Sequence, residues 1–488
     1  MGLATPARHP PNWVADAVVY QVFPDRFRRS GRVPAQQDLA LLAWGSDPAD
    51  QGFQGGDLLG VIEALDHLQG LGVTCLSLNP VFASAANHRY HTWDYLQVDP
   101  LLGGNAALEA LIAAVHGRGM RLILDGVFNH CSRGFWAFHH LVENGWRSPY
   151  RDWFHVQDWS LQPYPDDGQA CRYACWWNDP ALPKFNHAHP GVKRHLLKVA
   201  RHWLAAGIDG WRLDVPDEVP PDFWEAFRTA VHQVNPEAWI VGEIWGDARP
   251  WLGEGTKAPL FDGVMNYPLT WPILGYFGAA NLWTELRLPA VPKPPYEALD
   301  RASFQGRVEE ILNRYSDRVT CAQLNLLDSH DTPRALHALG GDRQALGLSL
   351  LFLFLLPGAP CIYYGTEQGL EGGAEPACRE AYPWEQPAGD LHELLQTLTA
   401  LRSAHPALRT RELRFLPSPD DDLLILERSA ESEHLWIAIN RGGQPMAVDP
   451  PQGLGNQLWP AVAMGIPERA AVEIPGQSAR IHLWNSLS

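Results

Sequence analysis

Basic residues are scarce in this chain. Its 488 residues include 38 Lys and Arg against 55 Asp and Glu, which gives a net charge of −17. This balance argues against a nucleic-acid or anionic-membrane surface, because both require a basic patch. Charged residues make up 19% of the chain and hydrophobic residues 46%, a composition that excludes disorder for most of its length.

Cysteine is also sparse. The seven cysteines are an odd number spread over a long chain, which argues against a disulfide framework. Cys171 and Cys175 lie four residues apart, but no second Cys or His pair follows at a zinc-binding spacing. We therefore interpret both as ordinary residues and expect no metal cluster built on His and Cys.

Long apolar runs are absent as well. The longest, Leu346–Leu356, is too short to cross a bilayer and predicts a buried helix. The first twenty residues, MGLATPARHPPNWVADAVVY, contain no apolar stretch behind a basic start and so lack the form of a signal peptide. We expect a cytoplasmic protein that binds neither nucleic acid nor membrane.

Short apolar runs that predict buried strands alternate with helical patterns from residue 17 to about residue 400. This alternation indicates a parallel sheet, and about eight repeats favour a closed (β/α)8 TIM barrel. The length of the chain also indicates two or three domains. The predicted strands are Ala17–Phe23, Cys75–Leu78, Leu122–Phe128, Gly210–Val215, Trp239–Ile244, Gln323–Leu327 and Pro360–Tyr364.

Two segments interrupt the alternation. Residues 131–189 are rich in Trp, Asp and Pro and predict a domain inserted after the third strand. Residues 406–488 contain short alternating strands and predict a C-terminal antiparallel β-domain, a β-sandwich. The barrel then comprises residues 1–130 and 190–405, with the Pro-rich residues 285–300 as a loop over one of its faces.

Acidic residues stand where several of these strands end. Active sites of barrels form at the carboxyl ends of the strands, so these side chains should converge on one mouth. Carboxylates held close together raise one another's pKa values, and at least one can then stay protonated near neutral pH. Each acid alone could instead cap a helix or pair with a basic residue. The polar residues at these ends are Asp125, His130, Arg212, Asp214, Glu243, Asp328, His330, Asp331 and Arg334.

Such a set of residues can cleave an acetal. One carboxylate attacks the anomeric carbon, and a second protonates the leaving oxygen. The chain is also rich in tryptophan, with 21 residues. Most would pack in the core, but some could stack on the flat apolar faces of sugars.

Four of the strand-end segments match a known pattern. DGVFNH (125–130), GWRLDV (210–215), GEIW (242–245) and NLLDSHD (325–331) resemble the signature segments of the α-amylase family of glycoside hydrolases. Further segments resemble the branch of neopullulanases, cyclomaltodextrinases and maltogenic amylases: NHRYHTWDY (87–95), LPKFN (182–186), DSHDTPR (328–334) and GGAEPACREAYPWE (372–385). The resemblance extends from about residue 12 to the C-terminus.

The resemblance implies a role for each matching position. Asp214 corresponds to the nucleophile, Glu243 to the general acid and base, and Asp331 to the acid that stabilises the transition state. Tyr90 corresponds to an aromatic residue that stacks on the sugar, with His88 beside it. The resemblance places the remaining substrate-binding positions at Asp125, His130, Arg212, Glu218, Trp245, His330 and Arg334.

The chain also departs from this branch. Its first barrel strand begins near residue 17, so we expect the branch's N-terminal β-domain to be absent and any oligomer to form without it. RRSGRVPAQQD (28–38) replaces the usual Asn- and Asp-rich calcium loop, so a calcium site is doubtful and we expect no cofactor. Gly246 stands where the branch usually has His, and His91 where it usually has Asp.

The function that these residues imply is retaining hydrolysis of α-glucans. We expect cleavage of α-1,4 and also α-1,6 glucosidic bonds in maltooligosaccharides, cyclodextrins, pullulan or branched glucans, with debranching included. A transglycosylase of the same family is one alternative. A non-catalytic carbohydrate-binding relative is another, although the presence of all three acids argues against it.

Overall fold

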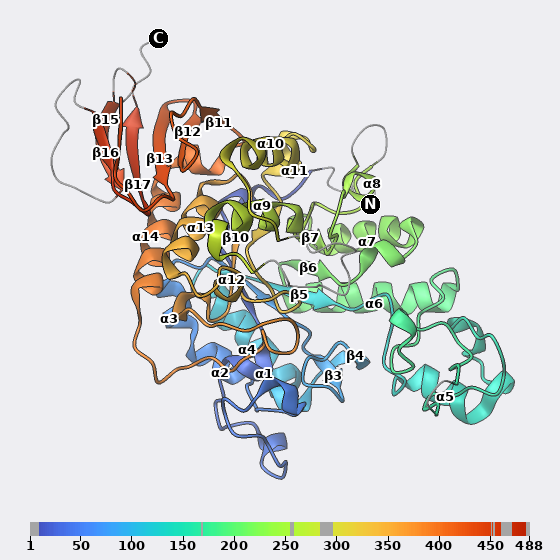
Figure 1. Ribbon diagram of the computed structural model, residues 1–488. Helices are drawn as coiled ribbons and strands as arrows, with labels where there is room; N and C mark the ends of the chain where they lie inside the picture. Colours follow the sequence, from blue (N-terminus) through green and yellow to red (C-terminus); the bar gives the residue numbers. More distant parts are fainter. Residues whose placement is uncertain are drawn as a thin grey trace.

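The computed structural model describes residues 9–166, 169–253, 258–283, 296–449, 451, 454–459 and 471–484. Eight parallel strands form its central sheet, in the order β8-β7-β6-β5-β2-β1-β10-β9 (Figure 1). A parallel bridge between Met265 and Leu324 joins the two edge strands and closes the sheet. The strands are β1 (Val19–Val22), β2 (Cys75–Leu78), β5 (Arg121–Gly126), β6 (Gly210–Leu213), β7 (Trp239–Gly242), β8 (Gly263–Val264), β9 (Leu324–Leu326) and β10 (Ala359–Tyr363).

The predicted TIM-type barrel is therefore confirmed, and seven of its strands fall on the predicted segments. The eighth strand, β8, corresponds to none of the predicted segments and is only two residues long. Two residues are too few to produce a recognisable alternation of apolar and polar positions.

Helices follow the strands and cover the outside of the barrel. The apolar run at Leu346 lies in α13 (Arg343–Leu355), a buried helix as predicted. α6 (Pro190–Ala206) shows how the sequence sets its ends: Pro190 occupies the first turn, and Gly207 ends the helix at a φ of 114°. Further helices are α2 (Leu58–Glu63), α3 (Leu65–Gly70), α4 (Gly104–His116), α7 (Pro221–Val234), α9 (Tyr267–Gly278), α10 (Arg301–Leu312) and α14 (Asp390–Ala404).

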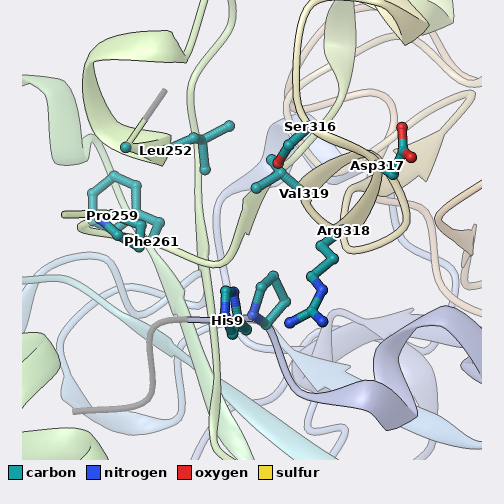
Figure 2. A pocket seen from close by; sticks show the side chains of 10 residues that line it. His9, Leu252, Pro259, Phe261, Ser316, Asp317, Arg318 and Val319 are labelled. Atoms are coloured by element: carbon teal, nitrogen blue, oxygen red, sulfur yellow. The ribbon is translucent and has the colours of Figure 1, made fainter. Parts of the chain in front are cut away.

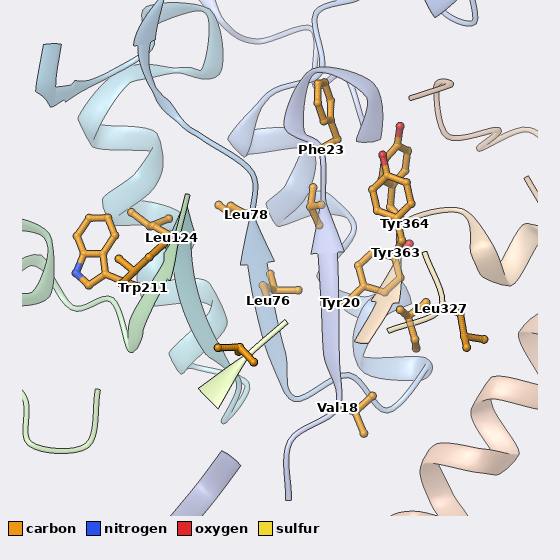
Figure 3. Close-up of a cluster of buried hydrophobic side chains, with 14 of the residues drawn as sticks. Val18, Tyr20, Phe23, Leu76, Leu78, Leu124, Trp211, Leu327, Tyr363 and Tyr364 are labelled. Atoms are coloured by element: carbon orange, nitrogen blue, oxygen red, sulfur yellow. The ribbon is translucent and has the colours of Figure 1, made fainter. Parts of the chain in front are cut away.

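Side chains alternate along each strand between the barrel interior and the surrounding helices. Tyr20, Leu76, Leu124 and Trp211 belong to the large core between strands and helices (Figure 3). Their neighbours, such as Ile123, belong to a second, smaller core. Because successive strand residues point to opposite faces, this second set fills the inside of the barrel.

The same alternation brings polar side chains to one end of the interior. Asp125 follows Ile123 by two residues on β5, and Glu243 follows Val241 by two residues at the end of β7. Apolar residues therefore fill the floor of the barrel, and the acids line its mouth at the carboxyl ends of the strands.

Two further segments extend from the barrel on different sides (Figure 1). After β5 the chain forms α5 (Trp136–Asn144) and a set of isolated bridges, among them Phe154–Phe185 and Cys175–Pro183. A short antiparallel pair, β3 (Phe82–Ser84) and β4 (Thr92–Val98), precedes it.

Near the C-terminus, an antiparallel sheet runs in the order β11-β12-β13-β17-β15, and β14 pairs with β16, which confirms the predicted antiparallel sheet. The domain boundaries remain predictions, and most of the predicted loop at 285–300 lies outside the described residues. The strands are β11 (Leu413–Leu416), β12 (Leu423–Ala430), β13 (Glu433–Asn440), β14 (Met446–Val448), β15 (Leu454–Trp459), β16 (Val472–Ile474) and β17 (Ser478–Trp484).

None of the described helices combines the length and the apolar composition that crossing a membrane requires.

Candidate active site

Arg212 lies at the centre of the acidic residues. Its Nη1 bonds to Asp125 at 2.9 Å and to Asp214 at 3.0 Å. Its Nη2 lies 3.0 Å from Glu243 and 3.9 Å from Asp331. Three strands, β5, β6 and β7, and the segment after β9 thus direct their carboxylates onto one buried guanidinium. The structure brings together all three acids to which the sequence assigned catalysis.

A second layer of contacts holds the Asp125 side of the cluster. The Tyr90 hydroxyl donates to Asp125 at 2.8 Å and also contacts His330 Nε2. The rings of Tyr90 and His330 are stacked, with 5.5 Å between their centroids. The Gln21 amide donates to His330 Nδ1 at 3.0 Å, which leaves the hydrogen of the imidazole on Nε2, facing Tyr90 and Asp331.

Glu243 is held by donors on both of its oxygens. Its Oε1 accepts a hydrogen bond of 3.1 Å from the Trp245 indole. Its Oε2 accepts one of 3.1 Å from the backbone N–H of Val215. The carboxyl group that the sequence identified as the general acid is therefore fixed in orientation.

Asp331 is held from the loop that follows β10. Arg379 lies 3.3 Å from Asp331 Oδ1 and donates to the backbone carbonyl of His330 at 2.9 Å. Glu375 lies 2.7 Å from the same guanidinium. Arg379 is not among the predicted site residues, although GGAEPACREAYPWE (372–385) contains it. Its place within that matching segment was the available signal.

Burial and crowding raise the pKa values of these acids. Burial, ahead of all other causes, raises the pKa of Asp125 to about 6, although Arg212 opposes the shift. Burial and then repulsion from Glu243 raise the pKa of Asp331 to about 8. The pKa of Asp214 is raised too, mainly by burial, and burial lowers the pKa of His330. At neutral pH this cluster of acids therefore holds protons, and the imidazole of His330 is neutral.

His130 lies next to the Tyr90 backbone, and its imidazole is buried. Its ring stacks on Trp176 at 5.3 Å, and burial lowers its pKa to about 3. Among the described residues, no hydrogen bond of normal geometry reaches its buried Nε2, although the Tyr90 backbone lies close enough to oppose the shift in pKa. A neutral imidazole carries one donor and one acceptor nitrogen, which suits a sugar hydroxyl.

The other predicted binding residues are spread over the rim. His88 accepts from the backbone N–H of Tyr90 at 3.2 Å and stacks on its ring. Glu218 is paired with Lys184 of the inserted segment at 2.7 Å. Arg334 does not join the acids: it is fully buried and donates to the backbone carbonyls of Cys378 and Tyr364.

A pocket of about 460 Å³ is lined on one side by Arg379, the residue that pairs with Asp331. Rings, amides and both charges line it, which suits an uncharged polar ligand with many hydroxyls. Its lining includes Phe23, Phe53, Asn87, His88, His91, Glu375 and Arg379.

Another pocket, of about 380 Å³, lies at the opposite end of the barrel (Figure 2). It is lined by residues that precede β8 and β9, such as Phe261 and Val319, so it faces the amino ends of the strands. In the described part of the chain, no group of three or more His, Cys, Asp or Glu side chains is placed to hold a metal ion. The expected absence of a cofactor stays a prediction.

Comparison with known proteins agrees with this geometry. Residues 21–410 match the family model described as the alpha amylase catalytic domain. The chain is 40% identical over 448 residues to a cyclomaltodextrinase from Geobacillus thermopakistaniensis, covering 90% of this chain and 72% of the relative.

Two solved structures are also similar. A debranching enzyme from Nostoc punctiforme has a TM-score of 0.84 and 40% identity, covering 97% of this chain and 99% of the other. A cyclic α-maltosyl-(1→6)-maltose hydrolase from Arthrobacter globiformis has a TM-score of 0.84 and 36% identity, with the same coverage.

Proposed function

Since the chain belongs to the α-amylase family of glycoside hydrolases, we propose that it is a retaining α-glucan hydrolase that cleaves both α-1,4 and α-1,6 glucosidic bonds. Its substrates are maltooligosaccharides, cyclodextrins, pullulan and branched glucans. The observation that carries this proposal is the arrangement of Asp214, Glu243 and Asp331 around Arg212.

Each acid has a separate task in the reaction. In its ionised form, Asp214 attacks the anomeric carbon and forms a covalent glycosyl-enzyme, while Glu243 protonates the leaving oxygen. A water molecule then attacks the same carbon as Glu243 removes its proton, which breaks the bond to Asp214 and releases the sugar with its configuration retained. Ionised Asp331 stabilises the positively charged transition state from beside the ring. Retention is checked by NMR, in which the α-anomer of the new reducing end should form first.

The contacts around the acids support binding of glucose units. Tyr90 is only half-buried beside Asp125, and the unbonded Nε2 of His130 provides a hydrogen-bonding nitrogen. The pocket of about 460 Å³ beyond Arg379 extends this binding region away from the bond that is cleaved. We assign it to sugars on the non-reducing side.

Cleavage of α-1,6 bonds is supported at Gly246. This exposed residue directly follows Trp245, and a Cβ added to it would meet no atom within 4 Å. The leaving side of the site is therefore open where a histidine is expected from the family pattern. The names of the two similar structures, a debranching enzyme and a (1→6)-maltose hydrolase, point the same way.

The direct test compares a maltooligosaccharide branched through one α-1,6 bond with its linear isomer. We expect kcat/KM for the branched substrate to equal or exceed that for the linear one. Digestion of pullulan separates the two cleavages, because panose marks α-1,4 and maltotriose α-1,6 hydrolysis. A preference above about tenfold for the linear substrate, which is roughly 1.4 kcal/mol of transition-state binding, would overturn the assignment of α-1,6 activity.

Gly246→His tests the open side, with Gly246→Ala as its matched control. The imidazole narrows the leaving side and should shift preference toward α-1,4 bonds by several-fold. The methyl group of alanine meets no neighbour and should leave the preference within about twofold. Equal behaviour of the two variants would show that this position does not control bond preference.

We further propose that the enzyme acts in the cytoplasm. All seven cysteines are free thiols, a state typical of reducing compartments. Fractionation of the source cells, followed by an activity assay, checks this assignment.

A further inference from the structure

Trp245 contacts the catalytic acid directly. Its indole Nε1–H donates to Oε1 of Glu243 at 3.1 Å. The family pattern placed this residue only on the acceptor wall, where its ring would touch the leaving sugar. The hydrogen bond shows that Trp245 also contacts the carboxyl group of Glu243, the general acid of the reaction.

The two oxygens of Glu243 are not equivalent. Oε2 accepts the N–H of Val215 and lies 3.0 Å from the Arg212 guanidinium. A proton on Oε2 would face the Val215 N–H and the positive charge of the guanidinium, and both would repel it. Oε1 accepts only the Trp245 indole in the described contacts, so one of its lone pairs can carry the proton.

The backbone at Val215 is arranged to keep this asymmetry. Val215 has a φ of 42°, which is strained for a β-branched residue. That conformation directs its N–H at Glu243 from the turn that follows Asp214. The strained residue therefore connects the nucleophile, Asp214, to the general acid, Glu243.

Stacked rings hold the indole in place. Trp245 lies flat on Tyr267, with 3.8 Å between ring centroids and 4° between the planes. Trp271 lies beside both rings, 6.1 Å from Tyr267 and 6.3 Å from Trp245. Tyr267 is itself fixed through its hydroxyl, 3.1 Å from Ser329 Oγ. The direction of the indole N–H is thus set by packing.

We propose that Trp245 is a positioning residue that holds the carboxyl group of Glu243 in the orientation that aims Oε1, the oxygen left to carry the catalytic proton, at the leaving glycosidic oxygen. The inference rests on the proposed function, because it concerns the general acid of that reaction. A residue that only stacks on the leaving sugar would affect binding. A residue that positions the proton affects the step in which the leaving oxygen is protonated.

The test is Trp245→Phe, which keeps an aromatic ring on Tyr267 and removes the N–H donor. The probes are α-maltosyl fluoride, 4-nitrophenyl α-maltoside and phenyl α-maltoside. Fluoride leaves without protonation, and nitrophenolate depends only weakly on protonation by Glu243. Phenolate is a poorer leaving group and requires it. The two aryl substrates present nearly the same ring to the acceptor side, so their difference reports acid catalysis.

We expect Trp245→Phe to hydrolyse the fluoride within about threefold of the parent rate, which also shows that the variant is folded. On phenyl maltoside and on glucans, kcat should fall roughly 10- to 100-fold, with KM within about twofold. The loss on 4-nitrophenyl maltoside should be smaller. An equal loss on both aryl substrates, or a loss confined to KM, would overturn the proposal.

Two control variants make the outcome specific. Trp271→Phe alters the same stack without touching Glu243 and should leave the difference between the two aryl substrates unchanged. Glu243→Gln should show the leaving-group pattern of Trp245→Phe in a stronger form. Normal glucan hydrolysis by Glu243→Gln would refute the proposed function itself. If Glu243→Gln is inactive but Trp245→Phe depends on the leaving group as the parent does, only the role of Trp245 is refuted.

Discussion

One guanidinium organises the acids at the mouth of this barrel. Arg212 contacts Asp125, Asp214 and Glu243 within 3.0 Å and is 2% exposed. A planar guanidinium can hold several carboxylates at fixed directions, which a lysine ammonium cannot do. The arrangement therefore depends on the shape of this cation as well as its charge.

The first prediction concerns the three acids. Asp214→Asn, Glu243→Gln and Asp331→Asn should each give a folded protein whose kcat/KM on maltooligosaccharides is at least ~10³-fold lower. Each change is nearly isosteric and removes only a charge or a proton that the transition state needs. Circular dichroism checks the fold, and near-normal turnover in any variant would remove that residue from its role.

The second prediction concerns the pH dependence of stability. Burial raises the pKa of Asp331 to about 8 from an ordinary value near 4, so between these values the folded state binds more protons than the unfolded state. Stability must then decrease as pH rises through this window. In Asp331→Asn this decrease is lost.

The Tm of Asp331→Asn minus that of the parent should accordingly increase by roughly 1–3 °C from pH 5 to pH 8. Calorimetry at several pH values measures it. A constant difference across the window would show that Asp331 ionises normally in the folded protein.

The sequence could place some site residues and not others. Asp125, Arg212 and Glu243 lie on or just after strands, and strand alternation alone directs them to the barrel mouth. Arg379 meets Asp331 from 48 residues further along the chain, through a loop whose path has no periodic pattern. Arg334 shares a motif with Asp331 but donates to the backbone of Cys378 and not to the acids.

At the scale of elements, a buried arginine connects several segments at the amino end of the barrel strands through hydrogen bonds. Arg402 of α14 is 1% exposed and remains charged, although burial lowers its pKa to about 10. Among the described contacts, it donates to backbone carbonyls of three separate segments, which precede β1, precede β10 and follow α14. These carbonyls belong to Ala15, Phe354, Leu356, Gly358 and Leu408.

The third prediction is that Arg402→Met destabilises the fold strongly. Methionine fills most of the space but leaves these carbonyls without donors, and an unsatisfied buried group costs about 1–3 kcal/mol. We expect a loss of at least about 3 kcal/mol in the free energy of unfolding, measured in urea. Arg402→Lys should recover part of it, and a Met variant as stable as the parent would contradict the assignment.

The distribution of apolar residues along the sequence predicted most elements of the fold. Four-residue strands with buried residues, such as Cys75–Leu78, and the apolar helix α13 could be identified from the sequence. β8 could not, because its two residues gain their strand pairing only from β7 and the bridge to β9. Short elements defined by tertiary contacts leave no local signal.

At the scale of the whole molecule, the inserted segment touches the active site at several points. Lys184 pairs with Glu218, and Trp176 stacks on His130. Exposed ion pairs contribute little to stability, so the buried ring contact is the stronger link. The insertion therefore forms one wall of the site as well as a projection from the barrel.

The fourth prediction is that chelation leaves the enzyme unaffected. The segment 28–38 is poor in oxygen ligands compared with the family's calcium loop. Activity and Tm should be unchanged after dialysis against EDTA, measured on the full chain. A decrease of several degrees that added calcium reverses would reveal a metal site formed by backbone carbonyls.

The closure of the barrel has a mechanical consequence. Between β8 and β9 the backbone contributes one bridge, and amide side chains supply the rest: Gln323 accepts from Val264 N–H, and Asn266 donates to Asn325. The barrel is therefore closed between β8 and β9 largely by side-chain hydrogen bonds, which a single substitution can remove. Under a pulling force, or in native-state hydrogen exchange, the barrel should open first along this line, and amides of β8 should exchange before those of β5 and β6.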